Sequence, residues 1–174
     1  MLNEVSKQIL QNNYQRVLIL GCPGSGKTTL VNMLTNRVNL PIFRIDDIYW
    51  GPDWSRIDKD KFKDLLFKIV TEDSWIIEGN YAEYLDIRLV KAQFVILIDI
   101  PTYICLWRAF IRAVRRILGD QKNLPQKIKD TGTHSLKFRR IYNFALKIIL
   151  FKKRTYPFMV AKIYEHKLPL FIIK

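Results

Sequence analysis

The segment that most constrains the fold of this chain is the run GCPGSGKT at residues 21–28. It matches the pattern G-x-x-x-x-G-K-[ST] at every fixed position. The run follows directly on the apolar stretch RVLIL and opens a helical pattern. Glycines let the backbone wrap closely around an anion, consecutive N–H groups converge on it, and a helix N-terminus adds partial positive charge. The run therefore predicts a phosphate-binding loop between a strand and a helix.

The side chains that end this run have separate predicted roles. We expect Lys27 to reach the β- and γ-phosphates of a nucleotide, the Thr28 hydroxyl to bind Mg²⁺, and Thr29 to contact the α-phosphate. Cys22 and Pro23 are expected only to shape the turn. The predicted nucleotide-binding residues are those of the run and the threonine after it: Gly21, Cys22, Pro23, Gly24, Ser25, Gly26, Lys27, Thr28 and Thr29.

A bound Mg²⁺ needs further oxygen ligands, usually carboxylates acting directly or through water. Three acidic positions fall at the carboxyl ends of predicted strands, where ligands bind in open α/β sheets: Asp46 with Asp47, Glu78, and Asp99. Asp99, in VILID, fits the pattern of a Walker B acid. The pattern alone leaves the choice open, because it depends on which strand lies beside the first.

Short apolar runs alternate with helical stretches along the chain, which is typical of β-α-β units in a parallel sheet. Five strands are predicted, at residues 16–20, 42–45, 75–77, 94–98 and 170–173. Helices are predicted at residues 27–37, 58–71, 82–91, 102–118 and 136–151, with another after Pro157. The pattern indicates an α/β fold in which residues 1–174 form one domain.

The interval between the fourth and fifth strands is far longer than one crossover helix needs. We expect residues 108–153 to form a helical insertion that acts as a lid over bound phosphates. The alternative is a plain surface loop that joins two helices.

Charge is distributed very unevenly. The 174 residues carry 29 Lys+Arg against 16 Asp+Glu, a formal net charge of +13. Counting along the sequence, residues 1–104 contribute 12 basic and 13 acidic side chains, and residues 105–174 contribute 17 and 3, or −1 and +14. Such a field favours a polyanionic partner, whether nucleotide phosphates, nucleic acid or an anionic surface.

Several classes of protein are disfavoured. Asp99 and Lys147 interrupt the longest apolar stretches, so no membrane span is predicted, and the first residues lack the apolar core of a signal peptide. Two cysteines, Cys22 and Cys105, form neither a disulfide framework nor a zinc site unaided. We expect a cytoplasmic protein without a membrane partner, as a monomer or homodimer.

Several ordered segments together carry a family resemblance. They are RVLILGCPGSGKTTL, PIFRIDDIYWGPDW, WIIEGNY followed by Leu85 to Arg88, VILIDIPTYICLWRAFIRAVRR and KKRTYP, from Arg16 to about Pro157. With these segments the chain resembles the adenylate-kinase-like P-loop kinases, and more closely the DNA topology modulation protein (FlaR-like) family. The resemblance implies a three-layer P-loop NTPase sandwich with a five-stranded parallel sheet of order 2-3-1-4-5, helices on both faces, and a helical lid.

The resemblance also implies roles for individual residues. Glu78 would help to hold Mg²⁺ through water, Asp46 would face and activate the phosphoryl acceptor, and Arg88 would clamp an anionic acceptor. Asp99 becomes a residue that turns the chain at a strand end. The remaining implied residues are those that line the acceptor pocket, namely Trp50, Gly79, Asn80 and Tyr81, and the helix arginines that contact ATP and the transferred phosphoryl, Arg108 and Arg112.

Two hypotheses about function follow. The first is an enzyme that transfers the γ-phosphoryl of Mg-ATP to a nucleotide or another small molecule, with Lys27, Asp46, Arg108 and Arg112 as catalytic residues. The second is a nucleotide-dependent regulator or nucleic-acid-associated ATPase that affects DNA topology, with the basic region 105–174 on the nucleic-acid backbone. A GTPase is disfavoured because the sequence has no N-K-x-D or T-K-x-D motif.

Overall fold

The structure is a computed structural model, and it describes residues 2–118 and 138–174. Its centre is a sheet of five parallel strands in the order β2-β3-β1-β4-β5. The strands are β1 (Arg16–Gly21), β2 (Ile42–Arg44), β3 (Trp75–Glu78), β4 (Phe94–Ile98) and β5 (Leu170–Ile173). This arrangement confirms the predicted five-stranded parallel sheet and its order.

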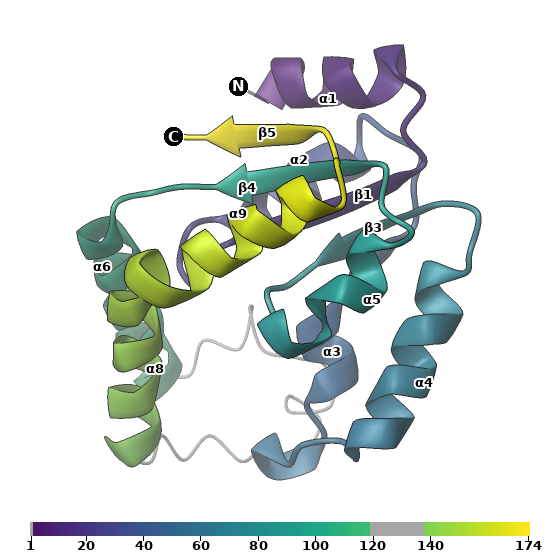
Figure 1. Ribbon diagram of the computed structural model, residues 1–174. Helices are drawn as coiled ribbons and strands as arrows, with labels where there is room; N and C mark the ends of the chain where they lie inside the picture. The colour runs from purple at the N-terminus through teal and green to yellow at the C-terminus, as the bar shows by residue number, and fades with distance from the viewer. Residues whose placement is uncertain (1, 119–137) are drawn as a thin grey trace.

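The two faces of the sheet are covered by different helices (Figure 1). Alternate residues of β1 point to opposite faces, so Val17 and Ile19 join one buried cluster while Leu18 and Leu20 join the other. The first cluster includes residues of α1 (Leu2–Gln11) and α2 (Lys27–Thr35). The second includes residues of α4 (Lys59–Val70), α5 (Leu85–Leu89) and α9 (Tyr156–Glu165). The three layers are those the resemblance implied.

Two further helices lie at the carboxyl ends of the strands. The helix α6 (Thr102–Ile117) begins just after β4, and α8 (Phe138–Leu150) packs against it (Figure 1). A π-helical turn, η3 (Phe151–Thr155), joins α8 to α9, and its Lys152 forms an ion pair with Asp99 beyond the end of β4. The middle of the predicted lid, residues 119–137, lies outside the described residues, so the lid stays a prediction.

Two element boundaries differ from the sequence expectation. Ile45, expected to end the second strand, is instead the first residue of α3 (Ile45–Tyr49), where Asp46 and Asp47 in the first turn suit the positive end of the helix. The helix expected over 82–91 is divided into a 3₁₀ turn, η2 (Ala82–Tyr84), and α5. Tyr84 has φ −113° and ψ 19°, which is not helical.

The sequence expectation contained no counterpart of α1 or of the 3₁₀ turn η1 (Pro52–Trp54), and it covered only the first residue of α3 and of η3. Val5 and Ile9 of α1 are buried, and they hold that helix on the sheet. Among the described residues, no helix is long and apolar enough to cross a membrane.

Candidate functional site

The loop between β1 and α2 has the backbone shape that a phosphate-binding loop requires. Gly24 and Gly26 have φ of +87° and +100°, in the left-handed region that favours glycine. A Cβ on Gly24 would lie 2.5 Å from the carbonyl oxygen of Cys105, so α6 leaves no room for a side chain there. Among residues 2–118 and 138–174, no side chain caps the N-terminus of α2, and the buried Ser25 hydroxyl has no hydrogen-bond partner. These polar groups suit an anion.

The Cys22 side chain points away from this loop into the core. It hydrogen-bonds with Cys105 of α6, which raises the pKa of Cys22 and lowers the pKa of Cys105. The Cys22 sulfur also lies 3.9 Å from the carbonyl oxygen of Ile148 in α8. Cys22 thus ties the loop to α6 and α8 by packing, and its expected part in shaping the turn stays a prediction.

The Lys27 ammonium lies over the beginning of the loop. Its Nζ donates hydrogen bonds to the carbonyl oxygens of Gly21 and Cys22, at 2.9 and 3.2 Å. Burial lowers the pKa of Lys27, while the nearby carboxylates of Glu78 and Asp46 act in the opposite direction. The cation is therefore partly desolvated, and its hydrogen bonds go to neutral carbonyl oxygens. A negatively charged phosphate oxygen is a stronger acceptor and can replace them.

Glu78 is the predicted acid that contacts Thr28. The Thr28 hydroxyl donates to Glu78 Oε2 at 3.4 Å, and Glu78 is only 7% exposed. Burial raises the pKa of Glu78, and Lys27 opposes that shift. Strand adjacency alone does not select this acid, since β3 and β4 both pair with β1. The distinction is that Asp99, at the end of β4, pairs with Lys152 instead.

The oxygens of Thr28 and Glu78 fit a hard cation such as Mg²⁺, which prefers one or two carboxylates together with phosphate oxygens and water. A cation there would also compensate the buried negative charge of Glu78. Both residues therefore stay as the predicted metal ligands.

Two arginines of α6 face this loop, one turn apart. Arg108 NH1 donates to the carbonyl oxygen of Ser25 at 3.4 Å. Burial lowers the pKa of Arg112, and the charges of Asp46 and Glu78 act against that shift. The i, i+4 spacing puts both arginines on one side of the helix. Arg108 therefore contacts the phosphate loop, and Arg112 interacts electrostatically with the two acids.

Asp46 lies in the first turn of α3, exposed, and it accepts a hydrogen bond from the Tyr81 hydroxyl at 2.5 Å. Burial, together with the charge of Asp46, raises the pKa of Tyr81, so the phenol stays a donor at neutral pH. Trp50 also hydrogen-bonds with Tyr81 and stacks edge-on against Tyr49, with ring centroids 5.0 Å apart. Three predicted acceptor-side residues therefore lie together, and the charge of one of them, Asp46, acts on Lys27.

Asn80 and Gly79 occupy the neighbouring segment. Gly79 has φ +139°, and a Cβ there would lie 3.0 Å from Cβ of Ile45. The Asn80 side chain pairs with the backbone of Gly21 in both directions, because Gly21 N–H donates to Asn80 Oδ1 at 3.0 Å and Asn80 Nδ2 donates to the Gly21 carbonyl at 2.6 Å. Sequence spacing gave no sign of this pairing, which joins residues 59 positions apart.

The structure assigns Arg88 a position unlike that of an open acceptor clamp. The residue is 0% exposed. NH1 donates to the Gly79 carbonyl at 2.5 Å, NH2 donates to the carbonyls of Asn80 and Tyr81, and Nε donates to that of Tyr84 at 3.3 Å. All three guanidinium nitrogens are thus used by the backbone, and we revise the acceptor-clamp prediction to one of holding residues 79–81.

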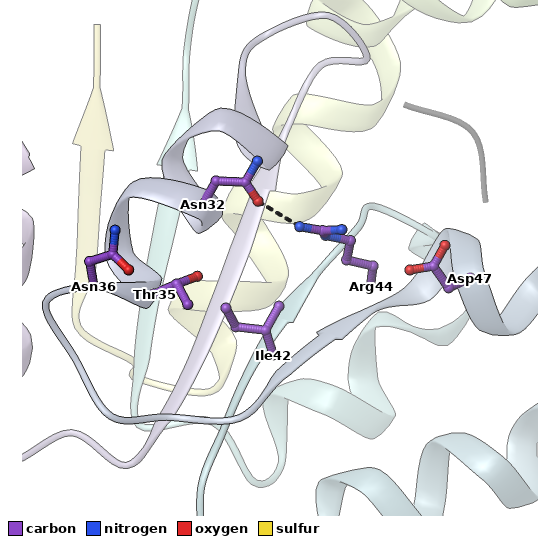
Figure 2. A pocket seen from close by; sticks show the side chains of 6 residues that line it. All are labelled: Asn32, Thr35, Asn36, Ile42, Arg44 and Asp47. Atoms are coloured by element: carbon purple, nitrogen blue, oxygen red, sulfur yellow. Dashed lines mark hydrogen bonds between the residues drawn. The ribbon is translucent and has the colours of Figure 1, made fainter. Parts of the chain in front are cut away.

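A separate cavity of about 510 Å³ lies beside α2 and the edge strand β2 (Figure 2). Most of its lining residues are polar, and Arg44 donates to Asn32 Oδ1 at 2.6 Å. The lining residues are Asn32, Thr35, Asn36, Ile42, Arg44 and Asp47. None of the residues predicted to bind nucleotide or acceptor lines this cavity.

The fold and the loop together define the class, a three-layer P-loop α/β protein with the sheet order of the adenylate-kinase-like kinases. A shikimate kinase from Acinetobacter baumannii, solved in complex with shikimate, resembles it with a TM-score of 0.58 at 14% identity, over 97% of this chain and 87% of that one. A shikimate kinase from Bacteroides thetaiotaomicron has a TM-score of 0.50 at 16% identity, over 84% and 82%. At these identities the likeness shows the fold. No family model and no curated protein matches the sequence, so membership of the DNA topology modulation family stays a prediction.

Proposed function

We propose that this chain is a P-loop phosphotransferase that moves the γ-phosphoryl of Mg-ATP to a small-molecule acceptor. The observation that carries the proposal is the convergence of Lys27, Thr28 and Glu78 on one loop, with Arg108 and Arg112 reaching it from α6. A loop that only bound phosphate would not need the second group of cations. Phosphoryl transfer does need it, because negative charge on the transferred group must be neutralised from several sides.

In this proposal the P-loop amides and the Ser25 hydroxyl bind the phosphates, and Lys27 moves from its two carbonyls to the β- and γ-phosphate oxygens. Arg108 and Arg112 neutralise the transferred group. Thr28 and Glu78 would hold Mg²⁺, which when bound supplies positive charge to the β- and γ-phosphates. Catalysis is then a matter of positioning and charge, with no covalent step on the protein.

Asp46 would receive the acceptor. Its exposed carboxylate lies near Lys27 and is oriented by Tyr81, so it can accept a hydrogen bond from an acceptor hydroxyl and take up its proton. A hydroxyl-bearing acceptor also fits the solved proteins of this fold, one of which is a shikimate kinase in complex with shikimate. We therefore place small alcohols beside nucleoside monophosphates as the acceptors to test.

The test is ADP release from Mg-ATP across a panel of nucleoside monophosphates, sugars and cyclic alcohols. We expect one class of acceptor to raise the rate, and Lys27→Ala to abolish that increase. Lys7→Ala, an exposed lysine on α1, is the matched control and should leave the rate unchanged. Hydrolysis that no acceptor accelerates, over the whole panel, would contradict the proposal.

The nucleic-acid hypothesis rests on the +14 charge of residues 105–174, part of which is already engaged. Arg108 and Arg112 face the P-loop, and Lys152 and Lys162 pair with Asp99 and Asp86. We favour the kinase for this reason. Duplex DNA binding that weakens steeply with salt would instead support the alternative, and its absence at low salt would exclude it.

A further inference from the structure

The carbonyl of Gly21, at the start of the P-loop, accepts two hydrogen bonds in this structure. One comes from Lys27 Nζ at 2.9 Å and the other from Asn80 Nδ2 at 2.6 Å. Gly21 is buried, and its N–H donates to Asn80 Oδ1. A carbonyl oxygen has two lone pairs, so both of its acceptor sites are used.

Phosphate binding changes this arrangement. When Lys27 turns to the β- and γ-phosphates, as the proposed function requires, it leaves the Gly21 carbonyl. A buried carbonyl without a donor is costly. Asn80 Nδ2 remains on that oxygen, and it is already in place before the nucleotide arrives.

We propose that Asn80 is a positioning residue for the P-loop, which keeps the Gly21 peptide paired when Lys27 moves to the nucleotide and so supports nucleotide affinity. This inference rests on the proposed function, and it assigns Asn80 to the nucleotide side in place of the acceptor pocket. The orientation of the amide is fixed by chemistry, because the Gly21 N–H can only donate and the Gly21 carbonyl can only accept.

The backbone around Asn80 is fixed independently of its side chain. The buried Arg88 guanidinium donates to the carbonyls of Gly79, Asn80 and Tyr81. Asn80 therefore meets Gly21 from a rigid segment, which is what a positioning residue needs. The same segment carries Tyr81, which orients Asp46, so it contacts both sides of the site.

The decisive variant is Asn80→Asp, which is nearly the same shape. Its carboxylate still accepts from the Gly21 N–H but cannot donate to the Gly21 carbonyl, and it attracts Lys27 away from the phosphates. We expect the Kd for Mg-ATP, measured by calorimetry, to rise about tenfold or more, the effect of losing one hydrogen bond of this kind. Asn12→Asp, the same change at an exposed position of the chain, should leave the Kd within about twofold of the unmodified protein, the ordinary scatter of a surface substitution.

Three outcomes are distinguishable. A Kd for Asn80→Asp equal to that of the unmodified protein would overturn the inference and leave the proposed function standing. Failure of the unmodified protein to bind Mg-ATP would overturn both. If Asn80→Asp does not fold, hydrogen exchange of the Gly21 amide in the unmodified protein decides, because the inference requires this amide to stay protected when Mg-ATP binds. Loss of that protection on binding would refute it.

Discussion

Replacing Arg88 by methionine should strongly destabilise the protein, because residues 79–81 and 84 depend on one buried guanidinium. Methionine preserves much of the aliphatic volume but removes every donor. Four backbone carbonyls then lose a charged donor in a place that is 0% exposed. An acceptor clamp would behave differently, since its loss would leave the fold intact and affect only the substrate.

The magnitude follows from two opposing effects. A hydrogen bond to a charged group contributes about 1.5–3 kcal/mol, and bonds from one side chain are not additive. Against this, burial lowers the pKa of Arg88 to about 9, so the native protein already bears a desolvation cost that methionine removes. Removing one partner of a buried charged network costs about 3–5 kcal/mol overall. For a chain of this length that corresponds to a fall in Tm of roughly 6–20 °C.

The assay is urea unfolding followed by circular dichroism, with the midpoint compared at constant m-value. Arg88→Lys keeps the charge but offers one nitrogen in place of three, so we expect an intermediate loss. Arg37→Met, at an exposed arginine after α2, should change the free energy of unfolding by less than about 0.5 kcal/mol. If the free energy of unfolding of Arg88→Met lies within about 1 kcal/mol of that of the unmodified protein, Arg88 does not hold residues 79–81 in place and the reasoning fails.

Three further predictions concern the phosphate loop and the acids. Burial raises the pKa of Glu78 above its value of 4.5, so its stabilising contribution is present below about pH 4.5 and is lost as pH rises through the folded value. Glu78→Gln should therefore have a higher free energy of unfolding than the unmodified protein at pH 7 but the same value at pH 4, and it should lose Mg²⁺-dependent activity. Glu72→Gln, at an exposed site, should change neither the stability nor the activity. Gly24→Ala should cost at least about 2 kcal/mol in thermal melts, because φ is +87° and a Cβ meets the Cys105 carbonyl at 2.5 Å; an unchanged melt would contradict the loop geometry. Asp46→Asn should lower kcat about 10²–10⁴-fold with little change in Mg-ATP affinity, and an unchanged kcat would exclude a proton-accepting role.

The sheet could be predicted because its signal is local. Each strand is a short apolar run, and the ends of β4 and β5 fall where the pattern placed them. The strand boundary at Ile45 was less predictable, since a β-branched residue followed by two aspartates is compatible with a strand end and with a helix start. In the structure the helix begins at Ile45, and α3 packs against α4.

In the candidate site, too, the features set by local sequence could be predicted and those set by contacts between distant residues could not. The P-loop residues follow one another in the sequence, so roles for Lys27 and Thr28 could be predicted from spacing. The pairings of Gly21 with Asn80, of Asp46 with Tyr81 and of Gly24 with Cys105 join residues far apart in the chain. They depend on how β2 lies beside β3 and on how β3 and α6 lie beside β1, which periodicity does not encode. The role of Arg88 could not be predicted either, because its place in a motif does not reveal whether the guanidinium faces solvent or backbone carbonyls.

The most direct test of the proposed function is to follow the γ-phosphoryl group itself. Mg-ATP labelled with ¹⁸O in the γ-phosphoryl would be incubated with the protein and the acceptor panel, and the products would be read by mass spectrometry. We expect the label in a phosphorylated acceptor, with transfer lost in Lys27→Ala. Label found in inorganic phosphate alone, with every acceptor unmodified, would contradict the assignment of this chain as a phosphotransferase.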